Sequence, residues 1–514
     1  MSSLKISYKK ILEILTQNNL LVEHNIKNSN LNEEIEFISD NSQNIVKNTL
    51  FFCKGLGFKE EYLIDAVKKG AVCYESEKKY DLFGYDCQYI IVNNILRSIS
   101  LIAPLYYGYP YEKLNLIGIT GTKGKTTTAH FLRDILDEYT QSQTGLLSSI
   151  ETFTGKQSEK SRNSTPEPCD LQQFLYEAKS SGMNYFTMEV SSQAYKRDRV
   201  FGIKFNNGIF LNIAEDHISP LEHENFEDYL NCKLEFMKNC SNIVINRETD
   251  CFDRVLEAAQ NSETLKQITL FGSEKVKDMC DYYYTYIKKD KKLLTFTAKS
   301  DKYNYNQEFK IKTPGLFNIE NAMSAIVMCK TLGIDDGSIR KGLAKTEIPG
   351  RMTVFEGGGV TVIVDYAHNL LSYIKLFESL KTDYPNGRII TVGGTPGNKA
   401  LNRRKDFGNI VGKNSDYIYL TSDDPQYEDT VKICEEIAKY MPKSLYEIIP
   451  DRVEAVTKAI NKAKSGDVVA LIGKGEEIYQ KINGKSVPYE SDLTLAQNLL
   501  AERKAVKYKE AVSV

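Results

Sequence analysis

The chain has 514 residues, which at about one hundred to two hundred residues per domain predicts two to four domains, each able to bury its own core. Hydrophobic residues make up 41% and charged residues 26%, and 66 Lys and Arg nearly balance 68 Asp and Glu. The formal charge of −2 is typical of a soluble globular protein and excludes one that coats nucleic acid or a membrane surface. The size excludes a peptide hormone or a single binding module.

Apolar runs such as residues 468–472 are far shorter than the roughly twenty residues that span a bilayer. The N-terminal residues place periodic Leu and Ile among Lys and Asn, which predicts a helix and not a signal peptide. The ten cysteines are scattered without a C-x-x-C pair, so we expect reduced thiols and a cytoplasmic location.

The first hundred residues alternate helical periodicity with short β-rich runs, which predicts a small α/β unit. The predicted helices cover residues 8–21 and 60–69, and the predicted strands cover residues 49–53, 71–74 and 89–92.

A larger α/β unit follows. An apolar strand at residues 114–119 leads through a glycine-bearing turn into a helix, which is the context that a phosphate loop requires. Strands such as 185–190 and 207–212 then alternate with helices up to about residue 345, and residues 314–333 predict a long helix. This alternation predicts a doubly wound sheet.

The tripeptide Pro349-Gly350-Arg351 interrupts the pattern, so we place a domain boundary there. The runs VTVIVDYA, RIITVGG, YIYLTSDD and DVVALIGKG, with helices between them, repeat the βα pattern beyond it. The charged tail after Asn498 predicts a fraying helix. We therefore predict α/β domains at residues 1–113, 114–348 and 349–514.

The strongest motif is the phosphate loop GITGTKGKTT at residues 118–127. Its glycines let backbone N–H groups surround phosphate oxygens, Lys125 can reach the terminal phosphates, and the Thr126 hydroxyl can bind Mg²⁺. The spacing G-x-x-G-x-x-G-K-T differs from the ordinary G-x-x-x-x-G-K-T and indicates a subtype. The alternative, a merely glycine-rich turn, does not account for the flanking strand and helix.

Two further strands end in polar residues. Glu189 in MEVSS and His217 in NIAEDH would face the carboxyl-terminal crevice of the sheet and could bind a metal ion. On spacing alone, a Glu at a strand end is more often solvated, and a loop His is as often a non-ligand as a ligand.

Together these segments resemble the Mur ligase family, the ATP-dependent amide-forming enzymes of peptidoglycan precursor synthesis, and within it the MurE type. The resemblance extends to about residue 492 through ordered motifs: Asn41-Ser42-Gln43, GTKGKTTT, Ser164-Thr165-Pro166-Glu167, EVSS, NIAEDH, FEDYLNCK, PGLFNIENA, PGRM, VDYAH, TSDDP and GKGEE.

The resemblance implies three domains: a smaller N-terminal α/β domain that holds a UDP-sugar, a central P-loop doubly wound ATPase, and a Rossmann-like C-terminal domain that brings an amino acid. ATP would convert the terminal carboxylate of the substrate into an acyl phosphate, which the incoming amine attacks. Two Mg²⁺ ions would neutralise the phosphates. The implied roles are cell-wall biogenesis, cell shape and cell division.

The implied catalytic residues are Lys125, Glu189, His217 and Lys233. Lys233 matches a lysine that is carbamylated in the family, although alone it would pass for a surface lysine. The implied metal ligands are Thr126, Glu189, His217 and Lys233. The implied nucleotide-binding residues are Gly121, Thr122, Lys123, Gly124, Lys125, Thr126, Thr127, Asn318, Asn321, Arg351, Asp365 and His368.

The same resemblance assigns Ser42 to uridine and a group of short hydroxyls and one arginine to the sugar and peptide. These sugar and peptide contacts are Ser164, Thr165, Pro166, Ser192 and Arg199. The implied contacts of the added amino acid are Arg404, Asp423, Asp424, Gln426, Gly473 and Glu477.

The chain departs from the family pattern at several positions. Asn41 and Gln43 replace Asp and Arg of D-S-R, Gln193 follows EVSS, GKGEE replaces G-K-G-H-E, and the segment between His217 and His223 is two residues longer than expected. Residues 394–399, GTPGNK, lack the arginine expected for the amino-acid carboxylate. Arg403, Arg404 or Lys399 must replace it.

The motif D-N-P-R, typical of enzymes that add meso-diaminopimelate, reads Asp423-Asp424-Pro425-Gln426. Loss of the Arg removes the group that would bind the distal carboxylate, and two acids with Glu477 favour a side chain that ends in an ammonium group. L-Lysine is therefore the expected amino acid, ornithine is indistinguishable, and diaminopimelate is less favoured. Alternatively, one of the two acids caps a helix.

Three alternatives to a MurE-type ligase remain open. The chain could use another acceptor, as folylpolyglutamate or cyanophycin-type enzymes do, or it could be a nucleotide-binding scaffold that has lost catalysis. A P-loop transporter subunit is less favoured, since no membrane-facing segment is evident. The expected partners of the ligase are UDP-MurNAc-dipeptide and a free amino acid, with no nucleic acid or membrane, and the expected state is a monomer.

Overall fold

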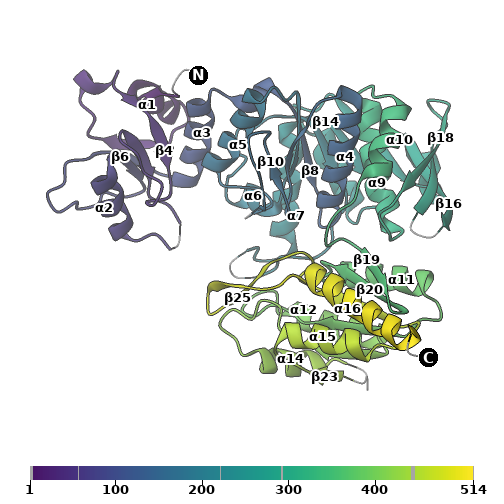
Figure 1. The fold of residues 1–514 in the computed structure, drawn as a ribbon. Helices are drawn as coiled ribbons and strands as arrows, with labels where there is room; N and C mark the ends of the chain where they lie inside the picture. The colour runs from purple at the N-terminus through teal and green to yellow at the C-terminus, as the bar shows by residue number, and fades with distance from the viewer. Residues whose placement is uncertain are drawn as a thin grey trace.

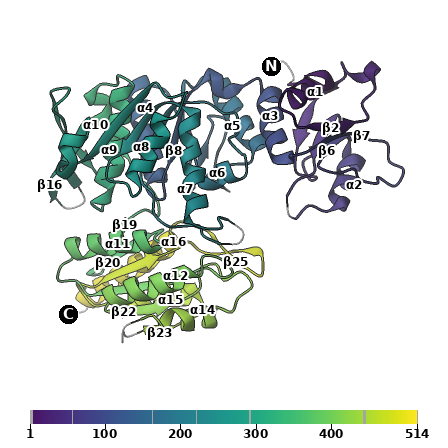
Figure 2. The same cartoon turned by 180° about the vertical axis from the view of Figure 1, so that it is seen from behind.

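The computed structural model describes residues 4–55, 57–161, 163–219, 222–290, 293–441 and 446–512. The chain forms three α/β domains, each built on its own sheet. The first domain lies at one end, the second follows it, and the third lies beneath the second (Figures 1 and 2). The predicted three-domain α/β architecture is confirmed.

The N-terminal domain contains a sheet with strand order β2-β7-β6-β5-β4, in which β2 runs antiparallel to β7 and the remaining neighbours are parallel. Leu50, Phe52 and Ile90 are fully buried between the sheet and its helices. The strands are β1 Ile6–Ser7, β2 Leu21–His24, β3 Glu34–Ile35, β4 Phe37–Ser39, β5 Thr49–Phe52, β6 Ala71–Ser76 and β7 Gln88–Val92. The helices are α1 Tyr8–Gln17, α2 Glu60–Lys69 and α3 Ile95–Tyr107.

The central domain contains an eleven-stranded sheet with the order β11-β10-β9-β12-β8-β13-β14-β15-β16-β17-β18. The strands are β8 Asn115–Thr120, β9 Gly145–Leu147, β10 Thr152–Phe153, β11 Ser158–Glu159, β12 Tyr185–Glu189, β13 Phe205–Phe210, β14 Cys240–Asn246, β15 Gln267–Ser273, β16 Tyr282–Asp290, β17 Leu293–Ser300 and β18 Tyr305–Ile311. The helices are α4 Lys125–Thr140, α5 Pro168–Ser180, α6 Ser192–Lys196, α7 Phe226–Leu234, α8 Phe252–Gln260, α9 Phe317–Thr331 and α10 Asp336–Lys345.

Helices cover both faces of this sheet, as a doubly wound fold requires. Helices α4, α9 and α10 belong to one hydrophobic core, and α5, α7 and α8 belong to another. Close packing on the second face needs glycine in two neighbouring strands, because a Cβ atom at Gly118 or Gly208 would lie 2.8 or 2.9 Å from the ring of Phe236.

The edges of the central sheet differ from the prediction of alternating strands and helices. Strands β16, β17 and β18 form an antiparallel meander, and β9, β10 and β11 pair antiparallel at the opposite edge. The connections within these antiparallel groups are too short for a crossover helix, which antiparallel neighbours allow and parallel neighbours do not.

The C-terminal domain has the strand order β19-β20-β24-β21-β22-β23, parallel except for the edge strand β19. Its strands are β19 Thr353–Gly357, β20 Val360–Asp365, β21 Ile389–Gly393, β22 Tyr417–Leu420, β23 Tyr446–Ile448 and β24 Val468–Ile472, with a separate hairpin of β25 Tyr479–Ile482 and β26 Lys485–Pro488. Its helices are α11 Leu370–Asp383, α12 Asn402–Asp406, α13 Gly412–Asn414, α14 Thr430–Ala438, α15 Arg452–Lys462 and α16 Asp492–Val512.

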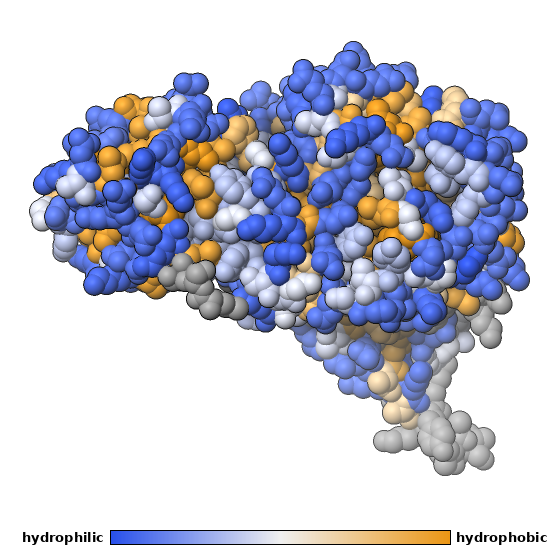
Figure 3. Space-filling model, turned by 90° about the horizontal axis from the view of Figure 1, so that it is seen from above, coloured by the Kyte–Doolittle hydropathy of each residue, from blue (hydrophilic) through white to orange (hydrophobic). Residues whose placement is uncertain are grey.

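Seen from above, the first two domains expose a mainly hydrophilic surface with separate hydrophobic areas (Figure 3). In the described part of the chain, we find no helix with the length and apolar character needed to cross a membrane.

Candidate active site

The phosphate loop connects β8 to α4. Gly121 and Gly124 adopt φ of 153° and 87°, and a Cβ atom at Gly124 would lie 2.2 Å from Oδ1 of Asn321. Glycine is therefore required at position 124. Nζ of Lys125 donates to the carbonyl of Gly121 at 2.8 Å, which holds this ammonium group at the mouth of the loop.

Thr126 and Glu189 meet at the start of α4 and the end of β12. The Thr126 hydroxyl donates to Oε1 of Glu189 at 2.7 Å, and the backbone N–H of Ser149 donates to the same oxygen at 2.6 Å. Glu189 is 1% exposed, and no Lys or Arg of the described residues forms an ion pair with it. Buried carboxylate and hydroxyl oxygens form a donor set that Mg²⁺ prefers.

Lys233, on α7, is 1% exposed and not a surface lysine. Its Nζ donates to the carbonyl of Gly121 at 2.9 Å and lies 5.0 Å from the centre of the Tyr229 ring. Burial lowers the pKa of Lys233 well below its ordinary value, and the charge of Lys125 adds to this effect. A lowered pKa favours the neutral amine, which is the nucleophilic form of a lysine.

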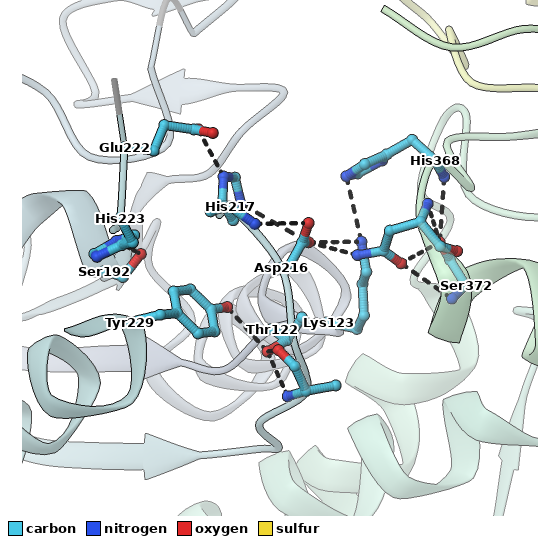
Figure 4. Close-up of polar contacts among 12 residues, drawn as sticks. Thr122, Lys123, Ser192, Asp216, His217, Glu222, His223, Tyr229, His368 and Ser372 are labelled. Carbon is cyan, nitrogen blue, oxygen red and sulfur yellow. Dashed lines mark hydrogen bonds and ion pairs between the residues drawn. The ribbon is translucent and has the colours of Figure 1, made fainter. Parts of the chain in front are cut away.

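His217 and His223 face different partners in the loop after β13 (Figure 4). Nδ1 of His217 donates to Oε1 of Glu222 at 2.8 Å. Burial would raise the pKa of Glu222, but the contact with His217 lowers it to about 2. Nε2 of His223 lies 2.9 Å from the hydroxyl of Ser192, and burial lowers the pKa of His223. Residues 220 and 221 of the longer segment between these histidines lie outside the described residues.

Asp216, which the sequence did not single out, joins the central domain to the C-terminal domain. Its carboxylate accepts hydrogen bonds from Arg403, at 2.8 Å, and from Asn369, and it lies 3.7 Å from Nζ of Lys123. Burial would raise the pKa of Asp216, but the charges of Lys123 and Arg403 hold it well below the usual range. Lys123 also contacts Nε2 of His368 at 3.3 Å, from the other side of the domain boundary (Figure 4).

The remaining predicted nucleotide contacts come from α9 and from the start of the C-terminal domain. On α9, Nδ2 of Asn321 donates to Oδ1 of Asn318 at 2.9 Å. Arg351 crosses the domain boundary, where Nη2 donates to the hydroxyl of Ser149 at 3.3 Å. Asp365 accepts a hydrogen bond from the backbone N–H that follows Arg351, at 2.8 Å, and so orders this junction.

A cavity of about 340 Å³ lies between the central and C-terminal domains and brings most of the predicted residues together. The predicted residues that line it are Thr122, Lys123, Gly124, Lys125, Thr126, Thr127, Ser164, Glu189, His217, Asn318, Asn321, Arg351, Asp365, His368, Asp423, Asp424, Gly473 and Glu477. Two of the three candidates for the missing arginine, Lys399 and Arg403, line it as well.

A second cavity, of about 640 Å³, lies between the N-terminal and central domains and contains the predicted residues Lys125, Ser164, Ser192, Arg199, His217 and Lys233. Four residues line both cavities: Lys125, Ser164, His217 and Glu222. Lys54, which the sequence did not single out, pairs with Asp40 at 2.8 Å in its wall. Arg199 pairs with Glu167 at 2.6 Å and donates to the carbonyl of Thr165 at 3.0 Å.

Several predicted contacts lie away from both cavities. Arg404 pairs with Glu428, at 2.8 Å, and with Glu436, so its guanidinium is committed within the C-terminal domain. Gln426 adopts φ of 56° and its backbone bonds to the β25 strand. The other predicted residues that line neither cavity are Ser42, Gly121, Thr165 and Pro166.

The acids predicted to bind the amine of the amino acid already surround the ammonium group of Lys474. Nζ of Lys474 donates to Oδ1 of Asp424 at 2.9 Å and to Oε2 of Glu477, and its side chain is fully buried. Tyr366 donates to the other oxygen of Glu477 at 3.0 Å. Asp423 forms no ion pair with any described residue, and burial raises its pKa to about 6. Asp423 is therefore the acid of this group without a direct ion pair, although the charge of Lys474 also acts on it and opposes the rise in its pKa.

Comparison with known proteins identifies two matching domain families. Residues 119–329 match the Mur ligase middle domain, and residues 350–475 match the Mur ligase, glutamate ligase domain. The UDP-N-acetylmuramoyl-L-alanyl-D-glutamate--L-lysine ligase of Enterococcus faecalis is 40% identical over 478 residues, which cover 91% of this chain and 92% of that protein.

Two solved structures share the fold at lower identity. A UDP-N-acetylmuramoyl-L-alanyl-D-glutamate--2,6-diaminopimelate ligase is 21% identical with a TM-score of 0.63, covering 97% of this chain and 99% of its own. MurF from Acinetobacter baumannii is 18% identical with a TM-score of 0.65, and the match covers 98% of this chain and 99% of MurF.

Proposed function

Because the chain belongs to the Mur ligase family, we propose that it joins L-lysine to UDP-MurNAc-L-Ala-D-Glu at the expense of ATP. It is an ATP-dependent amide-forming ligase of peptidoglycan precursor synthesis. The proposed location is the cytoplasm, where ATP is available, and the proposed state is a monomer. Residues 1–113 would hold the UDP-sugar, residues 114–348 the ATP, and residues 349–514 the amino acid.

The observation that carries this proposal is that the two cavities share part of their walls. Lys125, Ser164, His217 and Glu222 line both, so a nucleotide phosphate in one can approach a carboxylate in the other. Lys54 and Arg199 line the second cavity in ion pairs with Asp40 and Glu167, and they would bind a diphosphate or a peptide carboxylate by exchanging these partners. A scaffold without catalysis would not need this shared wall.

The reaction proceeds in two displacements. An oxygen of the substrate carboxylate bonds to the γ-phosphorus as the bond to ADP breaks, and the resulting acyl phosphate is then attacked by the amine, with loss of a proton and of inorganic phosphate. Lys125 and Arg351 would stabilise the phosphoryl charge from opposite domains. Asp216 and Arg403 would hold those domains together during both steps.

Mg²⁺ fits the donors that this site presents. Thr126 and Glu189 offer hydroxyl and carboxylate oxygens, His217 offers an imidazole, and Lys233 would add two oxygens once its neutral amine has bonded to CO₂. When bound, Mg²⁺ supplies charge neutralisation for the phosphates and the reacting carboxylate.

The amino-acid site favours a single terminal ammonium group. Lys474 contributes one positive charge to the group of acids Asp423, Asp424 and Glu477, so the group keeps a net negative charge, and Asp423 lines the cavity without a direct ion pair. Lys399 is a cationic group available for the amino-acid carboxylate, and Arg403, which pairs with Asp216, retains an Nε atom without a hydrogen-bond partner among the described residues. This arrangement supports L-lysine or ornithine over diaminopimelate, whose distal carboxylate would meet an acid.

An isotope-transfer experiment tests the reaction. The purified protein would be incubated with ATP, Mg²⁺, L-lysine and UDP-MurNAc-L-Ala-D-Glu labelled with ¹⁸O in its terminal carboxylate. We expect the lysine-containing product together with phosphate that carries one ¹⁸O atom, and Lys125→Ala should abolish both. Product formation without label in phosphate would contradict the acyl-phosphate route, and no product would contradict the proposed function.

A further inference from the structure

Ser192, His223 and Asp228 form a chain of three side chains beside the second cavity, and His223 and Asp228 have no role in the chemistry above. His223 lies between Ser192 and Asp228: its Nε2 is 2.9 Å from the Ser192 hydroxyl, and its Nδ1 is 3.1 Å from Oδ2 of Asp228. Figure 4 shows His223 beside Ser192 and turned away from His217. His223 is fully buried and Ser192 is 3% exposed, so water does not compete for these hydrogen bonds.

The acid at one end of this chain fixes the position of each proton. Nζ of Lys196 donates to both oxygens of Asp228 at 2.9 Å, which keeps the carboxylate ionised and makes it an acceptor. Nδ1 of His223 must then carry the proton that it donates to Asp228. Lys196 already neutralises this acid, so the fully buried ring has no charge partner for a second proton, and its Nε2 accepts the hydrogen bond that the hydroxyl of Ser192 donates.

We propose that His223 is a positioning residue that makes Ser192 a hydrogen-bond acceptor, so that Ser192 selects a peptide N–H of the substrate in the second cavity. A hydroxyl has one proton and two lone pairs, and the proton is already committed to His223. The lone pairs would repel a phosphate or carboxylate oxygen but accept from an amide. This inference rests on the proposed function, because it assumes that the UDP-linked dipeptide occupies this cavity.

The same cavity contains separate groups for anions. Arg199 and Lys54 lie in its wall, whereas Ser192 lies at the start of α6 next to the His223 contact. The cavity therefore contains cationic side chains for the charged groups of the ligand. It also contains one hydrogen-bond acceptor, the Ser192 hydroxyl, for a neutral amide N–H.

Substrate analogues test the acceptor role directly. Two UDP-MurNAc-dipeptide analogues would each replace one peptide N–H by an ester oxygen, and ligation kinetics would be measured for wild type and Ser192→Ala. Loss of one hydrogen bond predicts about a tenfold increase in KM for the natural substrate. The analogue that lacks the N–H bound by Ser192 should show this raised KM with the wild-type enzyme, and Ser192→Ala should not raise its KM further. Equal effects of Ser192→Ala on all three substrates would overturn the proposal.

A double-mutant cycle tests the positioning role of His223. His223→Ala should raise the KM for the dipeptide and leave kcat within about twofold, and adding Ser192→Ala should have no further effect. His223→Gln, whose amide oxygen can accept from Ser192, should recover part of the affinity. Additive effects of the two alanine variants would contradict the inference.

Controls distinguish a misfolded variant from failure of the proposed function and from failure of this inference. Ser262→Ala removes a hydroxyl that bonds to a backbone carbonyl elsewhere in the same domain, and it should leave KM unchanged. ADP affinity and thermal midpoint report whether each variant is folded, and the analogue experiment decides the matter if the His223 variants are not. An inactive wild type would refute the proposed function, whereas an active wild type with additive variants would refute this inference alone.

Discussion

Asp423 has no direct ion pair, whereas its neighbours Asp424 and Glu477 share the ammonium group of Lys474. Asp423→Asn removes the charge and keeps the size, so we expect the KM for L-lysine to rise by about 30-fold while the KM for ATP changes less than about twofold. Steady-state kinetics with each substrate varied checks this. Asp429→Asn is the matched control, because Asn also caps the helix that Asp429 begins. Equal effects of both variants would exclude Asp423 from amine binding.

The same acid predicts a pH dependence. Burial raises the pKa of Asp423 to about 6, so the carboxylate loses its charge as the pH falls through that value. We expect kcat/KM for L-lysine to fall by about tenfold per pH unit below pH 6 and to be level above it. The Asp423→Asn variant should lack this step. A wild-type profile that is level down to pH 5 would rule out Asp423 as the titrating group.

Glu75, in the N-terminal domain, gives a prediction for stability. It is fully buried beside the hydroxyl of Ser98, and burial raises its pKa to about 8, far above the ordinary value. The folded state therefore holds its proton more tightly than the unfolded state, so the associated stability is complete below about pH 4.5 and is lost as the pH rises to about 8.

Glu75→Gln removes this titration. Between pH 5 and pH 8, the unfolding free energy of wild type should fall relative to that of the variant by on the order of 3 kcal/mol. Denaturant unfolding at both pH values measures it. Parallel pH dependence of the two proteins would show that Glu75 does not hold a proton in the folded state.

The connection between β8 and α4 shows how an element depends on one residue. Gly124→Ala forces a Cβ atom against Asn321 and a side chain into the left-handed region, so we expect ADP affinity to fall by at least about tenfold. Gly333 also has a positive φ, but a Cβ atom there meets nothing within 4 Å. Gly333→Ala should therefore cost about 1 kcal/mol of stability and leave ADP affinity unchanged. Titration calorimetry with both variants distinguishes local strain from loss of the site.

Regular elements with strong local signals were predictable from the sequence. The helix predicted at residues 60–69 matches α2, since its ends carry acidic residues first and a left-handed glycine last. The helix predicted at residues 8–21 ends earlier, at Gln17, because Asn19 turns the chain at positive φ and β2 begins at Leu21. The β16–β18 meander was missed, because its pairing depends on partners that local periodicity does not identify.

The candidate site shows the same contrast between residues with a local sequence signal and residues whose contacts depend on distant parts of the chain. Residues in contiguous motifs, such as Lys125 and Glu189, line the first cavity together, and their roles stay predictions. Asp216 and Lys474 were missed as functional candidates, because their contacts lie in other domains or segments far along the chain. Arg404 was favoured for its charge, yet its ion pairs with Glu428 and Glu436 lie within its own domain.

At the scale of the molecule, the Asp216–Arg403 pair holds the central and C-terminal domains together over the first cavity. Arg403→Met removes the charge and leaves Asp216 buried, so we expect kcat to fall by about 100-fold with a smaller change in KM for ATP. Arg404→Met is the control, since its partners lie in one domain, and it should lower kcat by less than about fivefold. Equal losses would show that domain contact through Arg403 does not limit the reaction.

The central claim, selective addition of an amino acid with a terminal ammonium group, is tested most directly by competition. Equimolar L-lysine, L-ornithine and meso-diaminopimelate would be supplied with ATP, Mg²⁺ and UDP-MurNAc-L-Ala-D-Glu, and the product masses measured. We predict the lysine-containing product, with the diaminopimelate-containing product at less than about one per cent of it. A predominance of the diaminopimelate-containing product would contradict the role assigned to Asp423.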